Sequence, residues 1–219
     1  SEQNQVWIGL AKETAHPLGT PISGIVAWIE HLKLMAEGNE EINEIADEMR
    51  DDVKRLEEIS ERFSKIGAIP ELETQNILTV VHKNMSYMKR RAPRRVEFEY
   101  QETDPPILAN FNAPLFDWVL ENLLRNALDA MSREGKVTSE VFETEDSVII
   151  DITDTGKGIP PAKFKTIFKP GFSTKKRGWG LGLSLTQRII KNYHNGRIFV
   201  KQSEVDQGTT FRIELPKKV

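Results

Sequence analysis

The stretch SVIIDITDTGKG, residues 147–158, decides the fold of this chain. Its apolar run from Val148 to Ile152 predicts a strand, and the carboxylate of Asp154 stands at the end of that strand, before Gly156 and Gly158. Glycine lets a backbone come close to a neighbour, so this carboxylate is suited to accept a hydrogen bond from an exocyclic amine of a ligand. Considered alone, the stretch is better explained as an ordinary Asp-Gly turn.

A second glycine-rich run, GWGLGL at residues 178–183, opens a predicted helix. Free backbone N–H groups and a helix N-terminus together make a phosphate-binding arrangement. The segment between the two runs, residues 159–177, is long for a simple connection and is typical of a mobile lid. The candidate phosphate-binding residues of this region are Lys175 in the lid, then Gly178, Gly180, Leu181 and Gly182.

Two asparagines lie within the helical pattern of residues 113–131. Asn122 and Asn126 are four residues apart, so their side chains share one face of the helix, beside apolar neighbours. A buried amide needs a hydrogen-bond partner. Hydrogen bonds from the helix to a loop would meet that need, and so would an amide oxygen that ligates Mg²⁺, an ion that prefers oxygen ligands.

In their order along the chain, the two asparagines, the Asp154 loop and the glycine-rich run resemble the ATP-binding domain that sensor histidine kinases share with the gyrase, Hsp90 and MutL ATPases. The resemblance covers roughly residues 75–219 and implies a Bergerat-type α/β sandwich. Gly171 is a mild departure, because many members carry a second aromatic residue there. The four matching motifs are the N box at 122–130, the G1 box at 154–158, the F box at 168–175 and the G2 box at 178–183.

The resemblance implies a role for each motif residue in binding ATP and Mg²⁺. Asp154 would hold the adenine amino group, and Gly156 and Gly158 would permit close approach and lid movement. Asn126 would coordinate Mg²⁺, with Asn122 acting beside it. The glycine-rich run and the lid cations would hold the phosphates.

The first 66 residues contain no strand-like alternation. Apolar side chains recur there at steps of three and four, first from Trp7 to Met35 and again from Ile42 to Ile66. Gly38 and Asn39 supply a helix stop and an N-cap between the two patterns, so the sequence predicts a helical hairpin. Two helices alone do not cover stripes of this length, which favours a homodimer with a four-helix bundle.

The segment AHPLGTP, residues 15–21, resembles the H box of histidine kinases. The resemblance implies that His16, neutral at a reference pKa of ~6.5, attacks the γ-phosphorus of ATP and later passes the phosphoryl group to an aspartate of a response-regulator receiver domain. Thr20, one helical turn after His16, is expected either to position a water for phosphatase activity or to bond back to the backbone. The other three histidines match no motif and are expected to be solvated or structural; they are His31, His82 and His194.

Pro17 stands where most such kinases carry an acidic residue directly after the phosphorylated histidine. It predicts either a helix kinked around His16 or a helix that restarts at Pro17. Glu13 lies three residues before His16 and therefore on its face. We expect Glu13, or a water on the freed carbonyls, to take the ring proton; a merely solvated Glu13 is the alternative.

The sequence thus predicts an α+β chain with two domains. Residues 1–69 form the dimerisation and histidine-phosphotransfer domain, and residues 70–219 form the catalytic ATP-binding domain, an α/β sandwich. Besides the strand already described, strands are expected at 95–100, 136–142 and 210–215, and helices at 113–131 and 181–193.

Composition excludes several other classes of function. Thirty basic and 33 acidic residues give a net charge of -3, which argues against bulk nucleic-acid binding. The absence of cysteine excludes disulfides and thiol chemistry. No apolar run is long enough for a membrane span and no signal peptide is recognisable, so the chain is expected to be a cytoplasmic piece of a larger sensor, with or without a membrane anchor elsewhere.

Two alternatives from other classes remain open at this stage. One is an ATPase of the Hsp90 or MutL type, although these carry a water-activating Glu four residues before the metal-binding Asn, where this chain has Asn122. Glu121 lies about 100° away around the helix and cannot replace it. The other alternative is a pseudokinase scaffold that recruits regulators without transferring phosphate.

Overall fold

The computed structural model of the 219-residue chain describes residues 21–36, 38–65, 71–170, 172 and 182–217. The chain divides into two compact units, Ser1–Pro70 and Glu71–Val219, and each is described by itself below. Several predicted site residues lie outside the described residues: Glu13, His16, Thr20, Lys175, Gly178, Gly180 and Leu181.

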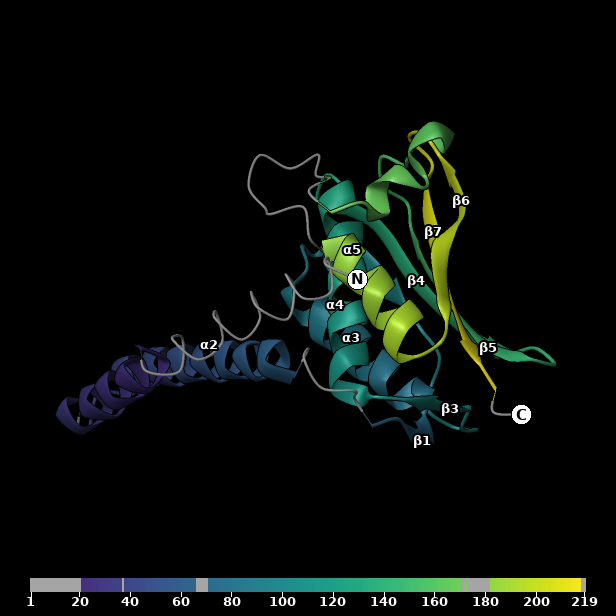
Figure 1. Cartoon of the computed structure of the whole chain (residues 1–219). Coiled ribbons are helices and arrows are strands. Elements are labelled where there is room, and N and C mark those ends of the chain that lie inside the picture. Colours follow the sequence, from purple (N-terminus) through teal and green to yellow (C-terminus); the bar gives the residue numbers. More distant parts are fainter. Residues whose placement is uncertain (1–20, 37, 66–70, 171, 173–181, 218–219) are drawn as a thin grey trace. The chain divides into compact units, whose positions relative to one another are not determined.

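The first unit contains two helices that pack against each other, residues 21–35 and α2, Glu40–Lys65 (Figure 1). Gly38 has a φ of 85°, a conformation that glycine adopts readily, and it ends the first helix as predicted. The side-chain oxygen of Asn39 accepts a hydrogen bond from the Ile42 N–H at 3.3 Å, which is the predicted N-cap. The buried residues between the helices are Ile22, Ile29, Ala46 and Val53.

A second apolar stripe in this unit stays exposed. Ile25 and Leu32 are seven residues apart on the first helix, a spacing that keeps both on one side of it. Their counterparts on α2 are Ile45, Met49 and Leu56, at steps of four and seven. The two described helices therefore bury one stripe and leave another without cover.

The second unit is built on a five-stranded mixed sheet with the strand order β2-β4-β5-β7-β6. Only β2 and β4 pair in parallel; the other neighbours are antiparallel. A separate antiparallel pair joins β1, Glu73–Asn76, to β3, Leu108–Phe111. The strands of the main sheet are β2 Arg95–Glu99, β4 Glu134–Glu143, β5 Ser147–Asp154, β6 Arg197–Glu204 and β7 Gly208–Pro216.

Three helices cover one face of this sheet, and the core lies between the two layers (Figure 1). They are α3, Ile77–Arg91, α4, Ala113–Ala130, and α5, Gly182–Arg188, which continues into a π-helical turn, Ile189–Tyr193. Asn112 caps α4, since its side-chain oxygen accepts a hydrogen bond from the Leu115 N–H at 3.1 Å. The helix layer thus carries the predicted asparagines on its central member, α4.

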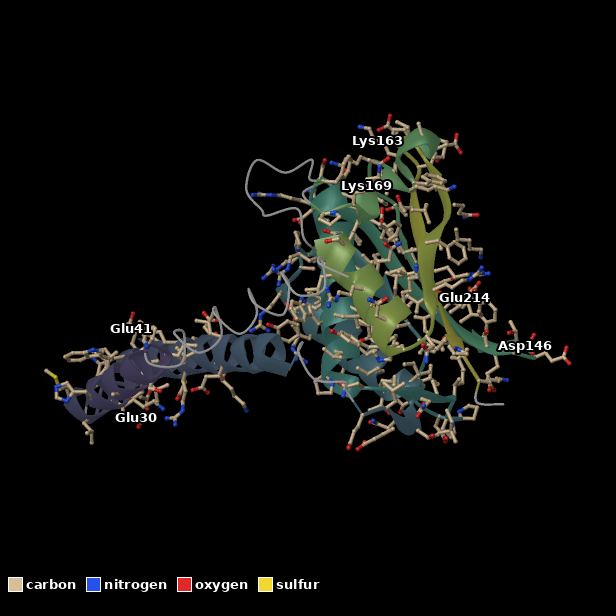
Figure 2. All side chains as sticks on the ribbon, in the orientation of Figure 1. Glu30, Glu41, Asp146, Lys163, Lys169 and Glu214 are labelled. Carbon is tan, nitrogen blue, oxygen red and sulfur yellow. The ribbon has the colours of Figure 1, made fainter. Side chains whose placement is uncertain are left out.

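The opposite face of the sheet carries paired charges. Asp151 accepts two hydrogen bonds from Arg212, both 2.8 Å, and one from Lys201 at 3.1 Å. Burial would raise the pKa of Asp151, but these hydrogen bonds together outweigh it and the pKa is lowered. Glu214, labelled in Figure 2, pairs with Arg197 on the same face. These carboxylates are therefore structural.

The predicted strands at 95–100, 136–142, 147–153 and 210–215 and the helix at 113–131 are confirmed to within three residues at their ends. The single helix predicted over 181–193 is corrected, because its second part is a π-helical turn. Four further elements, α3, β1, β3 and β6, were not predicted from the sequence. Among the described residues, no helix combines the length and the apolar character that crossing a membrane requires.

Candidate functional site

Asp154 is the last residue of β5, and its carboxylate is buried, with only 5% of the residue exposed. One carboxylate oxygen accepts a hydrogen bond from the Gly156 N–H at 2.8 Å. Burial raises the pKa of Asp154 to about 6, although hydrogen bonds from the backbone of Gly156 and Thr209 act in the opposite direction. No ion-pair partner for Asp154 occurs among the described residues. A buried carboxylate held only by backbone N–H groups keeps acceptor capacity for a ligand donor.

The two glycines after Asp154 are required by the protein's own backbone. A Cβ on Gly156 would lie 2.7 Å from the Ala130 carbonyl oxygen, and one on Gly158 would lie 2.0 Å from the Glu204 carbonyl oxygen. Gly158 also has a φ of 68°, which disfavours any residue with a side chain. The close approach predicted from the sequence is therefore, in this structure, an approach of the loop to the end of α4 and to the β6–β7 turn.

Asn122 connects α4 to α5. Its amide nitrogen donates a hydrogen bond to the Thr186 hydroxyl at 2.9 Å. Its amide oxygen faces Gly182, where an added Cβ would lie only 2.5 Å from that oxygen. Gly182, the first residue of α5, is thus needed for Asn122 to sit beside the end of the glycine-rich run.

Asn126 lies one helical turn after Asn122 on α4 and is half-buried, as Asn122 is. The two amides therefore share one face of the helix, as the spacing predicts. The bond from Asn122 to Thr186 joins two helices, whereas the structural possibility left open by the sequence was a pair of bonds from the helix to a loop. It occupies the amide nitrogen and not the amide oxygen, which is the atom that a cation would use.

Glu121 forms an ion pair within α4. Its carboxylate pairs with Arg125 at 2.6 Å, an i,i+4 ion pair along α4. The carboxylate next to Asn122 in the sequence is thus paired with a cation of its own helix.

The first part of the predicted lid is packed. Short 3-10 helices, Pro161–Lys163 and Thr166–Phe168, follow the glycine loop. Ile167 and Phe168 are buried, and the Phe168 ring stands edge-on to Phe211 at 6.2 Å between centroids. Residues 171 and 173–177 of the predicted lid lie outside the described residues, as do residues 178–181 of the glycine-rich run.

Sequence reasoning missed three residues that shape this site. Thr186 accepts a hydrogen bond from Asn122, the Thr209 backbone donates one to the Asp154 carboxylate, and Ala130 lies so close to Gly156 that no side chain fits there. Thr186 could have been suspected, because a threonine inside an apolar helical pattern needs a partner for its hydroxyl. Nothing in the sequence marks Thr209 or Ala130.

The chemistry of the donor set fits a ligand better than a protein-only metal centre. The described residues contain no group of three or more His, Asp or Glu side chains that could hold a metal ion. An amide oxygen of α4 would supply a single protein ligand, and Mg²⁺ commonly takes one or two protein ligands with the rest from water and substrate phosphates. The described residues therefore fit Mg²⁺ only together with a phosphate-bearing ligand.

The family comparison agrees with this geometry. Residues 112–219 match the model of the histidine kinase-, DNA gyrase B-, and HSP90-like ATPases. The chain is 33% identical over 213 residues to the sensor histidine kinase ZraS of Salmonella typhimurium, covering 94% of this chain and 45% of ZraS. It is 30% identical over 236 residues to sporulation kinase A of Bacillus subtilis, covering 100% of this chain and 36% of that kinase. The chain thus spans less than half the length of these curated relatives.

Solved structures of histidine kinases are also similar to this chain. The catalytic domain of histidine kinase ThkA superposes with a TM-score of 0.61 at 26% identity, covering 68% of this chain and 97% of that domain. ThkA in complex with the response regulator protein TrrA shares the fold at a TM-score of 0.61 and 20% identity, over 99% of this chain and 65% of that one. Four motifs in order, the buried carboxylate at the end of β5, the family model and the named relatives agree. The chain belongs to the sensor histidine kinases.

Proposed function

We propose that the chain is the catalytic core of an ATP-dependent protein-histidine autokinase that phosphorylates its own His16. The observation that carries the nucleotide part of this proposal is Asp154. Its carboxylate is buried and without a counter-ion among the described residues, so it is prepared for a neutral donor such as the adenine amino group. Membership of the sensor histidine kinases supports the phosphotransfer part.

The nucleotide would lie between the end of β5 and the start of α5. Asp154 would accept from the adenine amine at one end of the site. Asn126, with Asn122 beside it, would face the phosphates at the other end, close to Gly182. The donors from the preceding loop would be Lys175, Gly178, Gly180 and Leu181, as the family resemblance implies.

Mg²⁺ would bind the amide oxygen of Asn126 together with the nucleotide phosphates. Bound there, the ion would neutralise phosphate charge, which is the main requirement of phosphoryl transfer. Asn122 keeps α5 close to this position through its bond to Thr186. The contribution of the chain is to hold the reacting groups in place.

In the transfer step, a ring nitrogen of His16 forms a bond to the γ-phosphorus. The bond from that phosphorus to the β,γ-bridging oxygen breaks, and ADP leaves with the electron pair. The ring proton passes to Glu13 or to water. The phosphoryl group would then move from His16 to an aspartate of a response-regulator receiver domain, as the complex of ThkA with TrrA makes plausible for a kinase of the same fold.

The exposed apolar stripe of the first unit supports a homodimer. Ile25, Leu32 and Met49 belong to a row of large side chains that the two described helices leave in solvent. A second copy of the same hairpin would bury this row in a four-helix bundle, at ~25 cal/mol for each Å² of apolar surface removed from water. We therefore propose residues 1–69 as the dimerisation and phosphotransfer domain and residues 70–219 as the ATP-binding domain.

The test is the chemistry of the product. Incubation with ATP and Mg²⁺ should leave phosphate on the protein that is labile in acid and stable in base, as a phosphoramidate is. Steady release of inorganic phosphate without labelled protein would instead identify an ATPase of the Hsp90 or MutL type. Tight ATP binding with neither product would identify a pseudokinase scaffold.

Glu13→Gln should slow autophosphorylation about tenfold or more, within the ~10²–10⁴-fold range of general-base assistance. Glutamine keeps the size of the side chain but cannot take the ring proton of His16. The affinity for ATP should not change, because Glu13 belongs to the other unit. Rates are measured by radiolabel incorporation at saturating ATP; a wild-type rate in Glu13→Gln would leave water as the proton acceptor.

Thr20→Ala should lower phosphatase activity toward the phosphorylated regulator several-fold more than it lowers autophosphorylation. Thr20 follows His16 by four residues, which is about one turn of the predicted helix, so its hydroxyl would be able to position the attacking water. Thr20→Ser is the matched control, since it keeps the hydroxyl. Equal losses of both activities in Thr20→Ala would assign the threonine a purely structural bond to the backbone.

A further inference from the structure

Two of the hydrogen bonds among the described residues join α4 and its N-cap Asn112 to the segment 182–194, which comprises α5, the π-helical turn and the C-cap His194. In the first, Asn122 donates to the Thr186 hydroxyl at 2.9 Å. In the second, the backbone N–H of Asn112 donates to Nε2 of His194 at 3.1 Å. Both partners on the segment are buried, with 2% of each residue exposed.

His194 is held through both of its ring nitrogens. Nδ1 is 2.9 Å from the Ile189 carbonyl oxygen, so it carries the hydrogen and donates, while Nε2 accepts from Asn112. The ring also stands edge-on to Phe116 of α4, with 6.0 Å between centroids. Burial lowers the pKa of the imidazole, against the opposing effect of its bond to Ile189. The sequence offered two possibilities for this histidine; the structure excludes the solvated one.

The buried residues of the segment are mostly apolar. The buried side chains of α5 and the π-helical turn are Leu185, Ile189 and Ile190, together with Thr186. Apolar burial is non-directional, so it tolerates a small shift of one helix along the other. Buried hydrogen bonds do not tolerate such a shift, because it leaves a desolvated donor or acceptor without a partner.

The Asn112 end of this arrangement is itself anchored. Asn112 is the N-cap of α4, and its side-chain amide also donates to the Glu71 carbonyl oxygen at 3.0 Å. Asn112 therefore fixes His194 against the first turn of α4 and the first residue of the second unit. At the far end of the segment, Gly182 lies against the Asn122 amide.

We propose that His194 is a positioning residue which, together with Thr186, sets the register of α5 along α4 and thereby the affinity of the site for the phosphates of its nucleotide. The inference rests on the proposed nucleotide site, whose phosphate end is divided between these two helices. It concerns the phosphate end alone, because Asp154 is held by β5, β7 and Gly156 and not by α5.

Two substitutions of His194 each keep one of its two hydrogen bonds and remove the other. In His194→Asn, the amide nitrogen takes the place of Nδ1 and keeps the bond to Ile189, but the acceptor for Asn112 is lost. In His194→Gln, the amide oxygen reaches the place of Nε2 and keeps the bond to Asn112. His82→Asn is the control: His82 lies on α3 and packs edge-on to Tyr100 at 5.1 Å, away from α5.

Calorimetry with ATP and with adenosine is the first measurement. His194→Asn should raise the Kd for ATP ~5–10-fold, the effect of one buried hydrogen bond, and leave the Kd for adenosine unchanged. His194→Gln and His82→Asn should stay within about twofold of wild type for both ligands. Equal losses in the Asn and Gln variants, or an equal loss for adenosine, would overturn the proposal.

Amide hydrogen exchange of residues 183–188 without nucleotide is the second measurement. Exchange should accelerate in His194→Asn and not in His194→Gln, because the segment is released only when its bond to α4 is lost. If His194→Asn does not fold, Thr186→Val against Thr186→Ser decides the same question at the other bond. A wild-type chain that binds no nucleotide would refute the proposed function. Unchanged hydrogen exchange in these variants would instead refute the proposal that the two bonds set the register of α5 along α4.

Discussion

The His16→Gln chain is expected to incorporate no phosphate after incubation with ATP and Mg²⁺, while binding ATP as tightly as the wild-type chain does. Glutamine has no ring nitrogen to form the bond to phosphorus, so the loss should be complete. The affinity should be retained because the nucleotide residues belong to the unit Glu71–Val219 and His16 belongs to Ser1–Pro70.

The matched control for this prediction is His31→Gln. His31 lies on the described helix of the same unit, exposed beside Trp28 with 6.2 Å between ring centroids. It matches no motif, so His31→Gln should label at the wild-type rate. Radiolabel that survives base but not acid, measured on both variants, distinguishes the two histidines. A parallel loss of ATP binding in His16→Gln would show that the nucleotide site depends on the first unit.

The elements predicted correctly are those with a strong local signal. Residues 147–153 form a continuous apolar run, and the helix at 113–131 is bounded by the N-cap Asn112 and carries the apolar spacing along its length. Local sequence also settled the turn at Gly38 and Asn39, because both residues act through their own backbone or side chain. These features depend on nearest neighbours and were therefore visible before any packing was known.

Two of the missed elements had a signal that was overlooked. In α3, apolar residues follow the N-cap Asn76 with helical spacing, among them Leu78, Val81 and Met85. In β6, the apolar run at residues 198–200 follows the turn signal of Asn195 and Gly196. Strands β1 and β3, each of four residues, exist through their pairing with each other, so no local pattern predicts them.

The candidate site was predictable in its residue types and not in its contacts. Spacing alone placed Asn122 and Asn126 on one face of a helix. It could not show that Thr186, 64 residues away in sequence, accepts a hydrogen bond from the Asn122 amide. Nor could it show that His194, 82 residues from Asn112, accepts one from the Asn112 backbone N–H. Contacts of this kind arise from how α5 is laid on α4, which only the packed fold determines.

Asp154→Asn is expected to weaken nucleotide binding ~10–100-fold, the cost of a lost charge-assisted hydrogen bond. An asparagine can keep the bond from Gly156 with its oxygen, but it then presents its own NH₂ group to the adenine amine. The melting temperature should change little, because removal of a buried carboxylate whose pKa is raised to about 6 offsets the weaker hydrogen bond from the Thr209 backbone. Asp151→Asn is the contrasting variant: it leaves Arg212 and Lys201 without their partner and should lower the melting temperature without affecting nucleotide affinity.

The pH dependence of binding gives the same prediction a second readout. As the pH falls through about 6, the wild-type Asp154 carboxyl takes up a proton and loses the charge that strengthens its bond to the adenine amine. Adenosine is the suitable ligand, because it has no phosphate whose own titration would mask the change. Its Kd should rise between pH ~8 and pH ~5 in the wild-type chain and stay flat in Asp154→Asn, whose amide does not titrate. A flat profile in the wild-type chain, or the same slope in both, would mean that the Asp154 carboxylate does not contact the base.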